Sequence, residues 1–310
     1  MKPIWRMRPA VLLVALVLAA CSGISPGYSP ASRGPEHSPD SEMPAFENRL
    51  ETEHFVLRWT NKSRDPADNI PKPEIIQETG GYLEIAWSKY VELFGRTPYR
   101  APGKDKIEVV FRDIDCYGVA DPPDGPIQFS ADAWMKNPGI RQPTSAHELF
   151  HKLQYAYGYK TKWYPAPPYM WFTEGTAAWA EVYVWGRVSR QCKVEKIFQN
   201  TKIDLYDADD MAMPFWIYFV SGNGETPNNQ LMARLLERCE KLQDEKLAVK
   251  ELVQETYGPA DAYFASFAKE RKDGFWADCC SAPYRCILGP DGKDVVDQIK
   301  THQKKANQKS

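Results

Sequence analysis

The chain has almost no excess of charge of either sign and no apolar run long enough to cross a membrane. Its 310 residues contain 39 Lys and Arg against 41 Asp and Glu, a formal net charge of −2. Proteins that bind nucleic acid use a surplus of basic side chains to neutralise phosphates, so we expect no nucleic-acid partner. The apolar run at 10–20 has eleven residues, whereas a transmembrane helix needs about 20.

Histidine is also scarce, with five in the whole chain. Two of them, His147 and His151, enclose Glu148 in an H-E-x-x-H segment where a helix is expected. Composition alone gives such a segment roughly a one-in-a-hundred chance or less. Residues four apart on a helix share one face, so both imidazoles can reach the same metal ion. Glu148 can then reach a water on that metal without being a ligand.

A hydrolytic zinc site needs a third protein ligand, because zinc usually binds three side chains and one water. Glu174 follows His151 after 22 intervening residues, enough to finish one helix, turn and begin an antiparallel second helix. The small residues at 175–178 would let that helix pack closely against the first. Glu181 lies two turns beyond Glu174 on the same face, and we expect it to accept a hydrogen bond from a ligand histidine or from the backbone. A plain surface glutamate is the alternative for Glu181.

Two segments resemble motifs of the gluzincin metallopeptidases: H-E-L-F-H at 147–151 and W-F-T-E-G-T-A-A-W-A-E at 171–181. The second is especially similar to the aminopeptidase-N family and its peptidase MA-like relatives. The resemblance implies a zinc ion and a peptide or protein substrate. The zinc ligands that it implies are His147, His151 and Glu174.

The chain departs from that family in two respects. Its spacer between the second histidine and the glutamate is longer, and it has no G-x-M-E-N segment, the element that binds a substrate's free amino terminus. Aminopeptidase specificity is therefore not expected. The segment 53–59 and the run H-E-L-F-H-K-L-Q also resemble a family of uncharacterised bacterial metallopeptidases.

The expected reaction is hydrolysis of a peptide bond by a metal-activated water, with Glu148 as general base. The tetrahedral oxyanion needs a further donor, and Tyr206 or Tyr218 could supply it, although core packing explains either tyrosine as well. Two other functions stay open. One is hydrolysis of a non-protein amide by a zinc amidohydrolase, and the other is a membrane-tethered zincin-like binding module. Glu148 argues against the binding module, since binding alone needs no general base.

The amino terminus has the features of a signal peptide at 1–20. Three basic residues precede the apolar run, which ends in Leu18-Ala19-Ala20-Cys21, and this ending resembles the bacterial lipobox. Cleavage there would leave Cys21 lipidated, and several acyl chains would anchor the protein to a membrane. By resemblance to Gram-negative lipoproteins, Ser22 at the next position favours the outer membrane of the cell envelope. An ordinary signal peptide with a chance cysteine is the alternative.

The region 21–45 is rich in Ser, Pro and Gly and is expected to be a disordered tether. The segment 46–310 is long enough for one metallopeptidase domain of one or two lobes, and a monomer is favoured. An exported protein can keep disulfides, and six cysteines remain for them, with fifteen possible pairings. These cysteines are Cys116, Cys192, Cys239, Cys279, Cys280 and Cys286.

Hydrophobic periodicity predicts an α+β fold, and its order of strands and helices resembles the zincin-like architecture. It has a small mixed-sheet lobe at 46–158 that includes the H-E-x-x-H helix, and a mainly helical lobe at 159–310. Strands are expected at 55–60, 107–111 and 127–130. Helices are expected at 73–94, 144–157, 172–186, 191–199, 211–221, 228–241, 246–256 and 259–271. We expect the strand at 127–131 to be the sheet edge that pairs with an extended peptide substrate.

Overall fold

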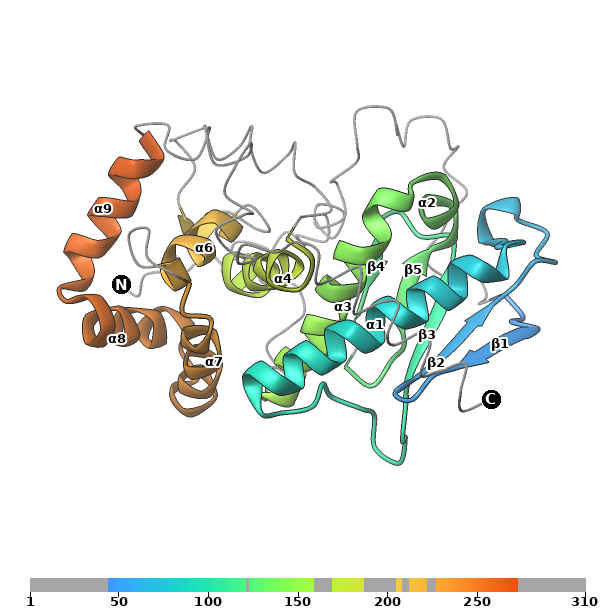
Figure 1. Cartoon of the computed structure of the whole chain (residues 1–310), viewed down its shortest axis with the longest axis horizontal. Coiled ribbons are helices and arrows are strands. Elements are labelled where there is room, and N and C mark those ends of the chain that lie inside the picture. Colours follow the sequence, from blue (N-terminus) through green and yellow to red (C-terminus); the bar gives the residue numbers. More distant parts are fainter. Residues whose placement is uncertain are drawn as a thin grey trace, which may run out of the picture.

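The computed structural model describes residues 44–120, 123–158, 169–186, 205–207, 212–221 and 227–272. The signal peptide, Cys21, nearly all of the tether and the helix expected at 191–199 lie outside these residues, so their assignments stay predictions. Within them the fold is α+β, as expected, with one mixed sheet and a set of helices (Figure 1).

The sheet has five strands in the order β1-β2-β3-β5-β4. The three central strands, β2, β3 and β5, run parallel to one another, whereas β1 and β4 lie antiparallel at the two edges. The strands are β1 (Asn48–Glu51), β2 (Phe55–Trp59), β3 (Ile107–Arg112), β4 (Gly118–Val119) and β5 (Ile127–Ser130).

Helix α1 (Pro73–Phe94) makes the crossover that parallel neighbours β2 and β3 require. It begins with proline at a position where the missing N–H costs nothing. It ends at Gly95, whose φ of 61° is a left-handed conformation that favours glycine. Along β2, alternate side chains are buried, and this period of two places one face of the strand against the core.

The expectation that 127–131 forms the sheet edge is wrong. Strand β5 lies between β3 and β4, and Ala131 already begins helix α2 (Ala131–Lys136). The edge on this side is the two-residue strand β4, which pairs with β5 through Gly118–Phe129 and Val119–Gln128. A strand this short carries no alternating pattern, so its sequence did not predict it.

Two long helices form the centre of the described structure. Helix α3 (Arg141–Ala156) packs against α1 on one side and α4 (Met170–Trp185) on the other. Their contacts run in opposite directions along the chain, from His147 with Glu181 to Gln154 with Thr173, so α4 returns along α3 in the antiparallel sense expected. Both helices are buried over almost their whole length, because neighbours cover every face of them.

The remaining described helices follow α4 in the chain and lie on the side of α4 away from the sheet (Figure 1). Their bounds agree with the expected helices to within two residues. They are α6 (Met213–Ser221), α7 (Gln230–Leu242), α8 (Glu245–Tyr257) and α9 (Ala260–Lys272). Short 3-10 helices occur at Pro66–Asp68, Pro138–Ile140 and Leu205–Asp207.

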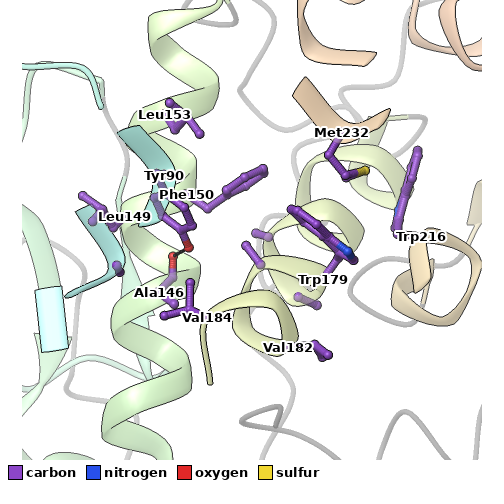
Figure 2. Packing of buried hydrophobic residues seen from close by; sticks show 14 of the residues in the cluster. Tyr90, Ala146, Leu149, Phe150, Leu153, Trp179, Val182, Val184, Trp216 and Met232 are labelled. Carbon is purple, nitrogen blue, oxygen red and sulfur yellow. Dashed lines mark hydrogen bonds between the residues drawn. The ribbon is translucent and has the colours of Figure 1, made fainter. Parts of the chain in front are cut away.

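One continuous apolar core joins α1, α3, α4 and the later helices (Figure 2). Phe150 of α3 is fully buried, and its ring lies 5.5 Å from Tyr90 of α1 and 6.1 Å from Trp179 of α4. Burying one such ring contributes about 1.5–3 kcal/mol. The Tyr90 hydroxyl donates to the carbonyl of Ala146 at 2.8 Å. The residue after Ala146 is His147, so the core fixes the backbone that carries the histidines.

Two of the six cysteines considered for disulfides are in the described ranges. Cys116 and Cys239 are both buried, and no disulfide joins these two residues to each other. Any pairing among the other four lies outside these ranges. Among the helices that the structure describes, none combines the length and apolar character needed to span a bilayer.

Candidate metal centre

Three side chains expected to bind a metal come together between α3 and α4. His147 and His151 project from successive turns of α3, and Glu174 projects from the first turns of α4. One ligand atom from each residue lies within 4.8 Å of the others. The histidines are buried and Glu174 is partly buried. Two imidazoles and a carboxylate are a donor set that suits zinc, so the group can hold a metal ion.

The Glu174 carboxylate links the two histidines. One of its oxygens lies 3.1 Å from Nε2 of His147, and the other lies 3.5 Å from Nε2 of His151. The two imidazole rings are 4.8 Å apart and nearly perpendicular, at 81°. All three side chains therefore converge through the atoms that a metal would use.

Glu181 lies behind His147. Its Oε1 is 2.8 Å from Nδ1 of His147, and the glutamate is only 2 % exposed. This is the contact that the spacing from Glu174 predicts. Burial by itself lowers the pKa of His147, but hydrogen bonds to Glu174 and Glu181 outweigh that effect and raise the pKa well above its ordinary value.

A different partner lies behind His151. Its Nδ1 is 2.9 Å from Oε1 of Gln154, a residue that is fully buried. Burial lowers the pKa of His151 to about 4, even though the negative charge of Glu174 acts in the opposite direction. The role of Gln154 was not predicted from the sequence. The signal was its position three residues after His151, which places both side chains on one face of α3.

Glu148 points to the edge strand. It is 5 % exposed and lies so close to Gly118 of β4 that a Cβ there would sit 2.7 Å from its Cγ and 2.8 Å from its Oε1. Glycine at 118 therefore leaves the space that the Glu148 carboxyl occupies. Three acidic side chains, those of Glu148, Glu174 and Glu181, thus gather around two histidines, which favours a bound cation.

Gly175 also has a specific packing role, but not the expected one. A Cβ at this position would meet Nε1 of Trp216 at 2.6 Å and Cβ of Ala212 at 2.8 Å. The small residue therefore allows close approach of α6, and not of α3. The Trp216 indole N–H donates to the carbonyl of Trp171 at 3.0 Å, which fixes the first turns of α4, where Glu174 lies.

The two tyrosines considered as oxyanion donors both make packing contacts. The Tyr218 hydroxyl donates to Ser266 of α9 at 3.2 Å, and the residue is 2 % exposed. Tyr206 lies edge-on to Trp171, with ring centroids 5.0 Å apart, and the Lys246 ammonium is 4.0 Å from its ring centroid. These contacts favour the core-packing alternative for both tyrosines.

Comparisons with known proteins give no independent assignment. No protein-family model matches the chain, and no curated protein sequence is significantly similar to it. Any function must therefore be argued from the chain's own residues and their geometry.

Proposed function

We propose that the protein is a zinc-dependent hydrolase of the gluzincin type, with a zincin-like fold, and that its substrate is a peptide or protein. The observation that carries the proposal is the convergence of His147, His151 and Glu174 beside the buried carboxyl of Glu148. A site that only bound metal would gain nothing from an additional buried carboxylate next to the ligands, since its desolvation costs free energy.

Each of these side chains has a role in the proposed site. His147, His151 and Glu174 would hold the metal, and Glu181 and Gln154 would orient the two histidines. Zinc bound there supplies a positive charge that makes a coordinated water more acidic and polarises the scissile carbonyl.

Glu148 moves the proton in this proposal. Its carboxylate accepts a proton from the attacking water and passes it to the leaving nitrogen as the amide bond breaks. The buried environment strengthens its electrostatic effect on the reacting atoms.

Strand β4 offers an edge along which an extended peptide substrate can bind. Within the described sheet, β4 is paired on one side only, with β5, and Gly118 of β4 touches Glu148. A peptide that adds to β4 by main-chain hydrogen bonds would lie next to the proposed general base. Strand β4 therefore replaces 127–131 as the proposed substrate-binding edge.

The location of the protein is a separate proposal. The lipobox-like segment ending in Cys21 supports a lipid anchor on a bacterial cell envelope, with the tether holding the domain near the membrane. Mass spectrometry of the amino-terminal peptide of the mature protein would test it. A lipid-modified Cys21 supports the anchor, and an unmodified residue there contradicts it.

A digest of a peptide library tests the enzymatic proposal directly. The wild-type protein with zinc is expected to cleave peptide bonds, and a chelator should stop the cleavage. If no peptide is cut although zinc is bound, the peptidase proposal fails. The same protein should then be tested on non-protein amides, such as those of cell-wall fragments.

Gly118 gives a sharper test of the role of Glu148. In Gly118→Ala, the new Cβ would lie within 3.0 Å of Cγ, Cδ and Oε1 of Glu148. The end of this flexible side chain must then move. We expect kcat to fall by about 100-fold, because a displacement of about 1 Å in a catalytic group costs on that order. Zinc content and thermal stability should stay close to those of the wild type.

Gly81→Ala is the matched control. Gly81 lies in α1, and a Cβ there would meet nothing within 4 Å. Alanine should raise helix stability slightly and leave kcat unchanged. Equal activity in Gly118→Ala and Gly81→Ala would show that the contact between Gly118 and Glu148 does not matter for catalysis.

A further inference from the structure

The side chain of Gln154 joins the second histidine of the candidate metal centre to the helix that carries Glu174. It is fully buried, and both its amide oxygen and its amide nitrogen have hydrogen-bond partners. Its Oε1 lies 2.9 Å from Nδ1 of His151. Its Nε2 donates to the carbonyl of Thr173 at 3.0 Å and to Oγ1 of Thr176 at 2.8 Å.

These partners determine which way the amide of Gln154 points. The carbonyl of Thr173 can only accept a hydrogen bond, so the amide nitrogen must face it. The Thr176 hydroxyl donates its own proton to the carbonyl of Phe172 at 2.7 Å, so it too is an acceptor toward Gln154. The amide oxygen is left facing His151.

The orientation of the amide determines the tautomer of His151. Because an amide oxygen only accepts, Nδ1 of His151 must carry the proton. The lone pair of the neutral ring then lies on Nε2, the nitrogen that faces Glu174 at 3.5 Å. The opposite tautomer would place two acceptors 2.9 Å apart in a buried site, which costs about 1–3 kcal/mol.

We infer that Gln154 is a positioning residue of the metal centre, which holds His151 as the Nδ1–H tautomer and fixes the third ligand through Thr173. Thr173 directly precedes Glu174, so one amide group sets both the ring of His151 and the backbone beside Glu174. His147 has a carboxylate behind it, whereas His151 has a neutral amide. The inference rests on the metal site of the proposed function, but not on the reaction.

The first test is the zinc affinity of Gln154→Met, measured by competition with a chelator of known affinity. Methionine keeps the length of the side chain and removes both the acceptor and the donor. Loss of a hydrogen bond behind a ligand histidine weakens metal binding by 10–100-fold in general, and we expect a dissociation constant raised by about that factor. A change of less than about twofold in a folded variant would overturn the inference.

Tyr257→Phe is the control for this variant. It removes a hydrogen bond between α8 and α6, from the Tyr257 hydroxyl to the carbonyl of Phe219, without touching either histidine or the helix that carries them. It should lower the stability by about 1 kcal/mol and leave the zinc affinity unchanged. An equal loss of zinc affinity in both variants would show that Gln154 acts through stability alone, which contradicts the inference.

The second test needs no variant. Nitrogen-15 NMR of the histidine rings in the wild-type protein separates a protonated ring nitrogen from an unprotonated one. We expect His151 to be protonated on Nδ1 and unprotonated on Nε2, with or without zinc. A proton on Nε2 in the neutral ring would overturn the inference. This readout is independent of hydrolysis, so a protein that binds zinc but cleaves no peptide still tests Gln154.

Discussion

Glu148→Gln is expected to abolish peptide cleavage while zinc stays bound. Glutamine has nearly the same shape as glutamate and fits the space beside Gly118, but its amide cannot accept the proton of the attacking water. General acid–base catalysis contributes about 10²- to 10⁴-fold to a rate, so kcat should fall by at least 100-fold. The measurement is single-substrate kinetics on a peptide found in the library digest.

The zinc content of the variant is its control. Glu148 is not among the three residues whose donor atoms converge on the site, so Glu148→Gln should bind about as much zinc as the wild type. Loss of zinc together with activity would mean that Glu148 is a ligand, which contradicts the assigned role. Unchanged kcat would remove the general base from the mechanism.

Removal of zinc should lower the thermal stability of the protein substantially. Without a metal, the carboxylates of Glu148, Glu174 and Glu181 are held close together in a largely buried site, and their mutual repulsion opposes folding. A ligand that binds only the folded state stabilises it by about 4 kcal/mol when its free concentration is about 1,000 times the dissociation constant. We therefore expect a melting temperature about 8–16 °C higher with zinc than with a chelator.

Glu174→Ala separates this effect from unspecific metal binding. The variant lacks one of the three donors and one of the three clustered carboxylates, so its melting temperature should hardly respond to zinc. A zinc response as large as that of the wild type would place the stabilising ion elsewhere in the molecule. No response in the wild type would mean that the cluster does not hold zinc.

The metal cluster could be predicted from the sequence because its geometry is mostly local. A helix of fixed pitch places His147 and His151 on one face whatever surrounds it. The position of Glu174 needed only the assumption of a second helix, and the contact of Glu181 followed from a spacing of two turns. Long helices also have a strong periodic pattern, so their bounds were predicted to within a few residues.

Features that depend on tertiary contacts could not be predicted in this way. Strand β4 has two residues, too few for any alternation, so the edge of the sheet was assigned to β5 instead. The contact between Gly118 and Glu148 joins elements 30 residues apart in the chain. Tyr218 was a candidate oxyanion donor, but in the structure its hydroxyl donates a hydrogen bond to Ser266 of α9. The direction of a side chain is set by packing, which the sequence pattern does not give.

The central claim is that the cluster of His147, His151 and Glu174 is a zinc site. Its most direct test is the zinc content per chain of the purified protein after dialysis, measured beside Glu174→Ala. The account predicts about one zinc per chain in the wild type and a large loss in the variant. A folded wild-type protein that holds no zinc, even after zinc is added back, would contradict it.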